Sequence, residues 1–326
     1  MLETIEMHVT NACTHSCPYC YMNSSMSNDK IEHADLSALF KIVDELRVYN
    51  VKYISLVGGD PVQHPDIESI IEYIHNSGIK VSVMSNTMYL KNADKMSTMI
   101  DNIDVTIHGR NRKEHDDFCR CDGAYDMLMT NLRFYASKGI NINVAVNVIP
   151  QTYDKVYDII EGVITQCGIH IGELLVQRIL PYGRAGDGKK WAVTPDQVNT
   201  FFSQAVDASQ DFGIDICVED PYPLCCLEQK YHHLMHGCPE GRTRMAIDLH
   251  GDAIRCGAEP VSSGYSVIKD SIKYIWEQSG MFDSFRKMDY IPVECKECSL
   301  VNLCRCGCPI SCMKCMNDGW YIKTVH

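Results

Sequence analysis

Three cysteines near the start of the chain, Cys13, Cys17 and Cys20, form a C-x3-C-x2-C array, and no other cysteine lies in the first hundred residues. Thiolates bind zinc and iron–sulfur clusters, and a [4Fe–4S] cube normally takes four of them. Three thiolates on one short loop would leave one iron with an open position, where a reactant can bind. The alternative is a Cys3His zinc site with His8 or His15 as the fourth ligand.

A second and denser group of cysteines lies in the C-terminal part of the chain. Cys238 and Cys256 are separated by x12-G-x4, and the run from Cys295 to Cys308 reads C-x2-C-x5-C-x3-C. The chain has 18 cysteines in 326 residues, and without a secretion signal such a number favours metal or redox chemistry over disulfides. A zinc ribbon built on the C-x2-C knuckles of this segment is the alternative.

Four further cysteines carry weaker signals. Cys167 and Cys217 stand among apolar residues and are predicted to be core thiols. Cys119 and Cys121 stand in a polar "FCRCDG" segment, which predicts a loop with a pair of free thiols.

The elements that must position these residues follow a repeating strand-then-helix pattern over residues 1 to about 215. The expected strands are 5–10, 51–59, 79–86, 103–109, 142–150 and 173–181. The expected helices are 35–49, 66–77, 124–138, 153–165 and 194–206. Six such units predict an α/β fold with a parallel sheet, partly closed into a barrel or open and doubly wound.

Functional loops of such sheets lie at the carboxyl ends of the strands. The cysteine loop follows the first expected strand, and three polar segments follow the next three. These segments are "GGDP" (58–61), "SNT" (85–87) and "HGR" (108–110). The sequence therefore predicts one site on one rim of the sheet.

The pattern changes near residue 217, where an irregular, proline-punctuated stretch begins. This change predicts three parts of the chain. They are a barrel domain at 1–215, a linker at 216–237 and a small cysteine-rich domain at 238–326.

Composition excludes several classes of partner. The net charge of −12 leaves no basic footprint for nucleic acid and no polybasic patch for a membrane. No segment reaches the roughly 20 apolar residues of a membrane helix, and the N-terminus lacks the features of a signal peptide. A cytoplasmic protein is expected.

The C-x3-C-x2-C array, with Tyr19 before its last cysteine, resembles the signature of the radical S-adenosylmethionine (SAM) superfamily. The six β-α units resemble the partial (β/α)6, TIM-like barrel of that family. The resemblance implies that Cys13, Cys17 and Cys20 hold a [4Fe–4S] cluster whose open iron binds SAM. It also implies that one electron cleaves SAM to a 5′-deoxyadenosyl radical, which abstracts a hydrogen atom from the substrate.

The same resemblance implies a set of SAM contacts. These are expected at Tyr19, Gly58, Gly59, Asp60, Pro61, Ser85, Asn86 and His108. The family's usual acidic residue is Glu, and Asp60 is one methylene shorter, so its carboxylate either contacts SAM less directly or fixes the loop. A structural hydrogen bond is the alternative role for His108. The segment "LPYGRA" (180–185) resembles one found after the sixth strand in many peptide-modifying members.

The C-terminal cysteine spacing resembles the SPASM domain, which carries auxiliary [4Fe–4S] clusters. The resemblance assigns Cys238, Cys256 and Cys308 to a first auxiliary cluster. It assigns Cys295, Cys298 and Cys304, with one of Cys312 and Cys315, to a second. The family's extra cysteine after the first one is missing, so the first cluster either keeps an open iron or takes Cys225, Cys226 or Cys306.

The resemblance predicts a SAM-dependent oxidoreductase that matures a ribosomally made peptide. A thioether or other cross-link is the first candidate, and Gly257 disfavours formylglycine formation, because relatives with that activity place an Asp there. The alternatives are a peptide epimerase with Cys225 or Cys226 as hydrogen-atom donor, and a non-catalytic iron–sulfur or zinc protein. Expected partners are the peptide and a flavodoxin or ferredoxin. Because the chain starts almost at its first strand, a leader peptide is expected to be recognised by a separate leader-binding protein or by the barrel itself.

Overall fold

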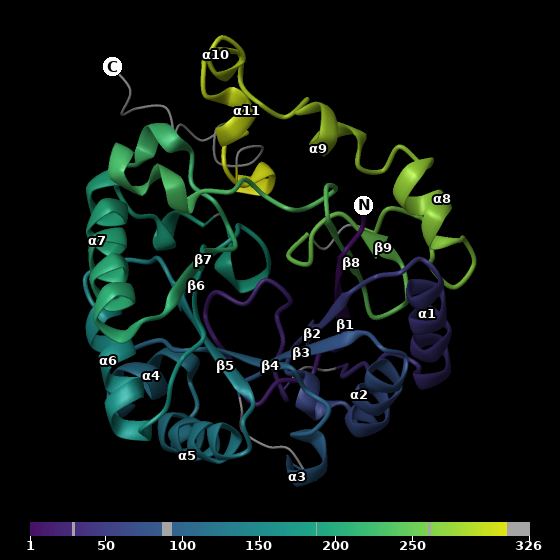
Figure 1. Ribbon diagram of the computed structural model, residues 1–326, viewed down its shortest axis with the longest axis horizontal. Helices are drawn as coiled ribbons and strands as arrows, with labels where there is room; N and C mark the ends of the chain where they lie inside the picture. The colour runs from purple at the N-terminus through teal and green to yellow at the C-terminus, as the bar shows by residue number, and fades with distance from the viewer. Residues whose placement is uncertain (28–29, 87–92, 187, 260–261, 312–326) are drawn as a thin grey trace.

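The computed structural model describes residues 1–27, 30–86, 93–186, 188–259 and 262–311 (Figure 1). Nine strands of this part of the chain form one sheet, in the order β7-β6-β5-β4-β3-β2-β1-β8-β9. Their bounds are β1 Thr4–Thr10, β2 Tyr53–Gly58, β3 Lys80–Met84, β4 Asn102–Thr106, β5 Asn141–Asn147, β6 Glu173–Gln177, β7 Asp215–Val218, β8 Arg244–Ile247 and β9 Ala253–Ile254. All neighbouring strands are parallel except β8 and β9.

Helices cover the outside of the curved sheet (Figure 1). They are α1 Leu36–Val48, α2 Ile67–Asn76, α3 Ala93–Met96, α4 Arg112–Cys119, α5 Ala124–Ser137, α6 Val156–Cys167 and α7 Pro195–Phe212. Four short helices follow on the side that these helices leave uncovered, namely α8 Ile272–Glu277, α9 Asp283–Lys287, α10 Val293–Lys296 and α11 Val301–Cys304. None of the helices in the described ranges is both long enough and apolar enough to cross a membrane.

The predicted α/β fold with a partial parallel barrel is confirmed, and each of the six expected strands is present. Three further strands extend the sheet, because β7 pairs with β6, β8 pairs with the other edge at β1, and β9 pairs with β8. Strand β7 crosses the expected boundary at residue 215, and β8 lies inside the expected cysteine-rich part. The division into domains stays a prediction.

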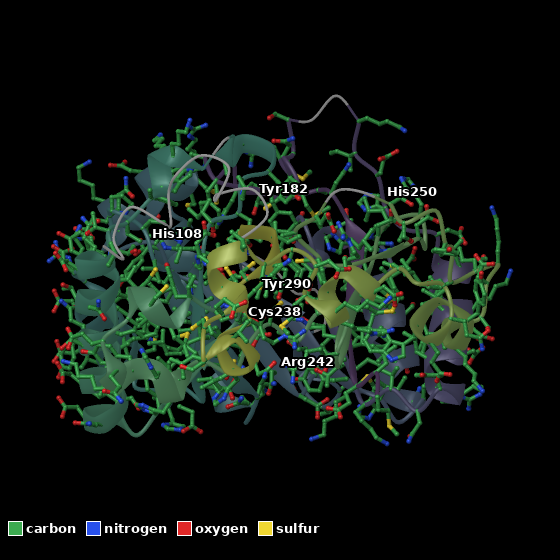
Figure 2. All side chains as sticks on the ribbon, turned by 90° about the horizontal axis from the view of Figure 1, so that it is seen from above. His108, Tyr182, Cys238, Arg242, His250 and Tyr290 are labelled. Atoms are coloured by element: carbon green, nitrogen blue, oxygen red, sulfur yellow. The ribbon has the colours of Figure 1, made fainter. Side chains whose placement is uncertain are left out.

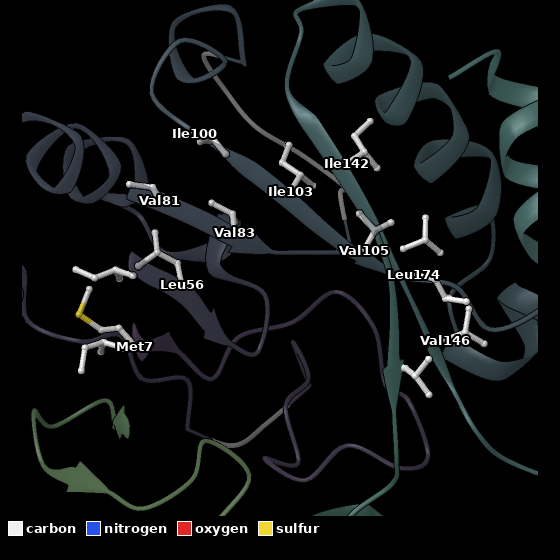
Figure 3. Packing of buried hydrophobic residues seen from close by; sticks show 14 of the residues in the cluster. Met7, Leu56, Val81, Val83, Ile100, Ile103, Val105, Ile142, Val146 and Leu174 are labelled. Atoms are coloured by element: carbon white, nitrogen blue, oxygen red, sulfur yellow. The ribbon is translucent and has the colours of Figure 1, made fainter. Parts of the chain in front are cut away.

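Apolar residues alternate along the strands and separate the two faces of the sheet. In β4, Ile103 and Val105 are buried in the main core, between the strands and the helices (Figure 3). The residues that alternate with them along β4, namely Asn102, Asp104 and Thr106, line a cavity inside the barrel. This alternation follows from the period of two in a β-strand. The core thus lies outside the barrel, and the barrel interior is polar.

The segment after β4 differs from the expected loop. Asn111 caps helix α4 by accepting a hydrogen bond from the Glu114 backbone N–H at 3.1 Å. Cys119 ends this helix and is fully buried, while Cys121 is half-buried. Both thiols are free, as predicted, but the prediction of a loop was wrong for Cys119, which lies in the helix. The helix was missed because its sequence is mostly polar and only its cap and one narrow face identify it.

Candidate active site

A cavity of about 550 Å³ lies inside the barrel. The cysteine loop that follows β1 lines it, together with residues at the carboxyl ends of the strands. The lining also includes Cys256, which is far away in the sequence. The single rim site expected from the sequence therefore has a defined space between the cysteine loop and the C-terminal part of the chain.

The cysteine loop is held by the segment "LPYGRA". The Arg184 guanidinium donates from Nε to the Cys17 carbonyl and from Nη2 to the Ser24 carbonyl, each at 2.8 Å. The Arg184 backbone N–H donates to the Cys20 carbonyl at 2.9 Å. Gly183 has φ +55°, and a Cβ there would overlap the carbonyl oxygens of Cys20 and Tyr21. A single segment thus fixes the backbone of the loop.

The three loop thiols are half-buried, and all cysteines of the described residues are free of disulfides. Burial raises the pKa of the Cys13 thiol to about 12 and raises the pKa of Cys17 well above its ordinary value. Neutral thiols in such a setting become thiolates when they bind a cationic centre. Two of the thiols already accept hydrogen bonds. The Ser24 N–H donates to Cys20 Sγ at 3.4 Å, and Asn86 Nδ2 donates to Cys13 Sγ at 3.8 Å.

The spacing of these donors bears on the kind of metal centre. Within the described ranges, no three His, Cys, Asp or Glu side chains meet closely enough to hold a single metal ion. Thiolates on a [4Fe–4S] cube bind separate irons and stand further apart than the ligands of one ion. The cluster and the Cys3His zinc alternative with His8 or His15 both stay predictions from the sequence.

The "GGDP" segment packs directly against the cysteine loop. The Gly59 N–H donates to the Thr10 carbonyl at 2.7 Å, and the Asp60 N–H donates to the Ala12 carbonyl at 2.8 Å. A Cβ at Gly58 or Gly59 would overlap those same carbonyl oxygens. The two glycines are therefore required for the close approach of the two loops.

Asp60 fixes this loop from behind the cavity. Its carboxylate is 1% exposed and accepts hydrogen bonds from the Ser85 hydroxyl at 2.9 Å and the Val62 N–H at 3.3 Å. Burial raises its pKa to about 6. Asp60 and Pro61 do not line the cavity, whereas the other expected SAM contacts do, namely Tyr19, Gly58, Gly59, Ser85, Asn86 and His108. Of the two roles expected for Asp60, the geometry supports the fixing of the loop.

His108, labelled in Figure 2, lies two residues after the end of β4 and lines the cavity. Its Nε2 is 3.4 Å from the Tyr19 hydroxyl and 4.0 Å from Cys17 Sγ. Its ring stacks on His115 with centroids 5.3 Å apart. Burial lowers the pKa of His108 well below its ordinary value, so the ring is neutral. A neutral ring can donate one hydrogen bond from Nε2, toward the sulfur or the phenol.

The sequence did not identify many of the residues that line the cavity, and Asn147 and Cys217 are two of them. Asn147 ends β5, is 3% exposed, and its Nδ2 has no hydrogen-bond partner among the described residues. A buried, unpaired amide that lines a cavity suits a polar ligand such as SAM. Cys217 was predicted to be a core thiol, but it is half-buried and lines the cavity from β7. Strand alternation would have identified both, because Asn147 shares its face of β5 with Asn143, and Cys217 shares its face of β7 with Asp215.

The far side of the cavity is rich in charged groups. Arg244 pairs with Glu6 at 3.2 Å and with Glu240 at 2.5 Å. Glu219 accepts a hydrogen bond from Gln177 Nε2 at 2.7 Å, and burial raises the pKa of Glu219 to about 7. A polar wall of this kind can bind the amides and polar side chains of a substrate.

The C-terminal cysteines form two groups. Cys238, Cys256 and Cys308 are mutual electrostatic neighbours, and burial raises the pKa of each thiol. Cys238 and Cys308 are buried, and Cys256 opens to the cavity. These three are the cysteines expected at the first auxiliary cluster.

The second group gathers around Cys304, whose Sγ accepts a hydrogen bond from the Leu224 N–H at 3.3 Å. Its members in the described residues are Cys225, Cys226, Cys295, Cys304 and Cys306. Cys298, three residues after Cys295, is exposed. Cys312 and Cys315 lie outside the described residues.

Cys225 and Cys226 do not line the 550 Å³ cavity. Cys225 is exposed, and Cys226 lines a separate cavity of about 60 Å³. Their thiols interact with each other and with Cys304. The geometry thus brings these two cysteines to the second group of thiols rather than to the substrate space.

Residues 7–163 match the sequence pattern of the Radical SAM superfamily. A nucleotide dehydratase of Selenomonas ruminantium that depends on S-adenosylmethionine is 26% identical over 39% of this chain, which is 47% of that protein. The PqqA peptide cyclase of Ruegeria pomeroyi is 22% identical over 91% of this chain and 81% of its own length. The mycofactocin maturase MftC of Mycobacterium tuberculosis is 24% identical over 92% of this chain and 76% of its own length.

Solved structures show the same fold. SuiB of Streptococcus suis bound to S-adenosylmethionine has a TM-score of 0.76 at 15% identity, over 95% of this chain and 74% of that one. The anSMEcpe structure with bound AdoMet and a Cp18Cys peptide has a TM-score of 0.69 at 16% identity, over 94% of this chain and 89% of that one.

Proposed function

The chain carries a radical SAM domain over residues 7–163, and on this basis we propose that it is an enzyme that forms a thioether or other cross-link in a ribosomally made peptide. The observation that carries the proposal is the shared cavity. Cys13, Cys17 and Cys20 line it on one side, and Cys256 of the first auxiliary group lines it on the other. A substrate held there would lie between a radical source and an electron acceptor.

The proposed residues have separate tasks. When bound, the reduced cluster and SAM supply the radical that removes a hydrogen atom from the substrate. Cys13, Cys17 and Cys20 would hold the cluster, while Arg184 and Gly183 keep their loop in place. SAM would be bound by the groups that line the cavity around this loop, namely Tyr19, Gly58, Gly59, Ser85, Asn86, His108 and the unpaired amide of Asn147.

Cross-link formation removes a second electron and a proton from the substrate after hydrogen abstraction. We assign the electron to auxiliary [4Fe–4S] clusters. The first would use Cys238, Cys256 and Cys308, and the second Cys295, Cys298 and Cys304 with Cys312 or Cys315. Among the polar groups of the cavity, the carboxylates of Glu6 and Glu219 could accept the proton.

The peptide substrate is supported by the names of the relatives. One is a peptide cyclase, another is the maturase MftC, and SuiB has been solved with its precursor peptide SuiA. The cavity lies within the usual size of ligand pockets, about 300–1,000 Å³, which suits one peptide segment at a time. A flavodoxin or ferredoxin as electron donor and a separate leader-binding protein remain parts of the proposal.

Anaerobic reconstitution with iron and sulfide, followed by dithionite and SAM, tests the radical chemistry. The protein should release 5′-deoxyadenosine, and a Cys20→Ala variant should not. With a short peptide encoded beside the gene, mass spectrometry should show loss of two hydrogens and of one alkylatable thiol. Deoxyadenosine release with an unchanged peptide thiol count and a new carbon–carbon link would exclude the thioether but not the cross-link.

A peptide epimerase is the second candidate, and the position of Cys217 favours it. Cys217 is a thiol of β7 on the cavity wall, so it could return a hydrogen atom to a substrate radical. Cys225 and Cys226, the donors expected from the sequence, do not line this cavity. An epimerase would leave the peptide mass unchanged in water and add deuterium in D2O. Cys217→Ala would abolish that exchange while SAM cleavage continued.

A further inference from the structure

The first auxiliary group has three thiols, although a [4Fe–4S] cube normally takes four protein ligands. Cys225, Cys226 and Cys306 were the candidates for the fourth position. In the structure all three gather around Cys295 and Cys304. The strongest electrostatic neighbours of Cys238 and Cys256 are instead Cys308, Glu6, Glu240 and Arg244.

Glu240, two residues after Cys238, has an incomplete set of partners. The residue is 3% exposed. Its Oε1 accepts a hydrogen bond from Arg244 Nε at 2.5 Å, but its buried Oε2 has no partner among the described residues. Leaving a buried acceptor unpaired is costly, and a charged acceptor more so, so such an atom calls for an explanation.

The carboxylate lies beside the thiols. The Glu240 backbone N–H donates to the Cys238 thiol, and Glu240 is the strongest charged neighbour of Cys256. Contacts across the barrel agree with this position. A Cβ at Gly257 would overlap Glu6 Oε2, Glu6 pairs with Arg244, and Arg244 pairs with Glu240.

The turn that carries Glu240 is fixed. The backbone N–H groups of Arg242 and Thr243 donate to the Pro239 carbonyl at 3.0 Å. Gly241 has φ +72°, and a Cβ there would press on the ring of Phe282. Cys238 and Arg242, both labelled in Figure 2, stand two residues before and two residues after Glu240 in the sequence. The turn therefore holds the Glu240 backbone two residues from Cys238, and Arg244 holds one oxygen of its carboxylate.

We propose that Glu240 is the fourth protein ligand of the first auxiliary cluster, through Oε2, and this rests on the auxiliary clusters proposed above. Arg244 would hold the other oxygen and orient the ligand, as the hydrogen-bond partners of ligating carboxylates do. The cluster would then be complete without substrate and suited to accept an electron. A substrate thiol could bind its iron only by displacing a carboxylate.

Glu259 offers a matched control. It is 5% exposed and pairs with an arginine four residues away, Arg255, as Glu240 does with Arg244. Both of its oxygens are taken by the Arg255 guanidinium. Glu259 therefore represents a buried ion pair with no oxygen left for a metal.

The test uses the full chain with Cys13, Cys17 and Cys20 changed to Ala, so that only auxiliary clusters form. After anaerobic reconstitution, iron content and bound ¹³C-cyanide per chain are measured, the latter from hyperfine couplings in electron paramagnetic resonance. Glu240→Gln, which keeps the shape of the side chain, should bind one more cyanide per chain than its parent. Glu240→Cys should remove that extra cyanide, and Glu259→Gln should match the parent.

Equal cyanide binding by the parent and Glu240→Gln would overturn the proposal, whether both bind it or neither does. An extra cyanide produced by Cys312→Ala or Cys315→Ala at the first cluster would also overturn it, because that thiol would then be the ligand. A parent chain that binds no cluster would instead refute the auxiliary clusters themselves. Circular dichroism of each variant checks that the fold is retained. If Cys312→Ala or Cys315→Ala does not fold, the comparison of Glu240→Gln with its parent still decides the proposal.

Discussion

At the scale of single residues, burial sets the chemistry of the site. Cys13, Cys17, Asp60 and His108 are partly or fully buried, and burial moves the pKa of each in the direction that favours its neutral form. Neutral groups cost little to bury, and they gain a partner only when a charged ligand arrives. The site is therefore built to change its charge on binding the cluster and SAM.

Asp60→Asn should change how stability depends on pH. Burial raises the pKa of Asp60 from 3.8 to about 6, so the folded chain holds this proton more tightly than the unfolded chain. The wild type is expected to lose stability, relative to the variant, as the pH rises from about 4 to 6, by ~3 kcal/mol in all. Roughly half of this change falls between pH 5 and pH 7.5.

Thermal unfolding of the reconstituted wild type and Asp60→Asn at these two pH values measures the effect. The asparagine keeps an oxygen that can accept from Ser85 and Val62, so the loop contacts are retained. A difference in Tm that is the same at both pH values would show that Asp60 is ionised in the folded chain throughout.

His108→Phe should lower the reduction potential of the radical SAM cluster. His108 Nε2 lies 4.0 Å from Cys17 Sγ, and N–H donors near cluster sulfur stabilise the reduced, more negative state. His108→Gln retains a donor and should shift the potential less. Redox titration followed by electron paramagnetic resonance gives the potentials. Equal potentials in all three proteins would mean that the ring donates to Tyr19 alone.

At the scale of elements, three loops are fastened to one another around the cavity. The glycine-rich turn after β2 contacts the cysteine loop through Gly59 and Asp60, and the segment after β6 contacts it through Arg184. Most of these contacts are to backbone carbonyls. The shape of the cysteine loop is therefore imposed by its neighbours rather than by its own sequence.

Arg184→Ala should weaken the cysteine loop and with it the radical SAM cluster. The variant loses two hydrogen bonds from its guanidinium, to the carbonyls of Cys17 and Ser24. Iron content should fall by about four atoms per chain, the content of one [4Fe–4S] cluster, while the auxiliary clusters remain. Arg133→Ala is the matched control, because Arg133 also donates twice to a backbone carbonyl, that of Gln166, but outside the cavity. Equal iron in both variants would count against the role of Arg184.

At the scale of the whole molecule, local patterns predicted the elements but not all their neighbours. Strands β1 to β6 follow from apolar alternation and short connections. The pairing of β8 with β1 joins residues far apart in the sequence, and no local pattern specifies which edge a strand will join. Cys217 was misread for a related reason, because its apolar neighbours Ile216 and Val218 point to the other face of β7.

The residues of the candidate site could likewise be predicted only in part. The spacing of Cys13, Cys17 and Cys20 was enough to identify their loop, and six of the eight expected SAM contacts line its cavity. The tasks of Arg184, Asn147 and Glu240 depend on which carbonyls and thiols the fold brings to them. Such contacts come from the three-dimensional arrangement, so residue type alone does not predict them.

The β1–β8 pairing predicts that the barrel depends on the C-terminal part of the chain. Thr4 to Met7 pair with β8, and Glu6 pairs with Arg244. A chain that ends at Val218 loses both and exposes the edge of β1, which invites aggregation. Its β1 amides should exchange with deuterium much faster than in the full chain. A chain that ends at Ile254 keeps β8, so its β1 amides should be better protected than those of the chain that ends at Val218. Exchange measured by mass spectrometry on peptides from β1 and, as reference, β5 tests this. Equal protection of β1 in the two shortened chains would mean that the barrel is stable without its eighth strand and that the C-terminal part folds against it as a separate unit.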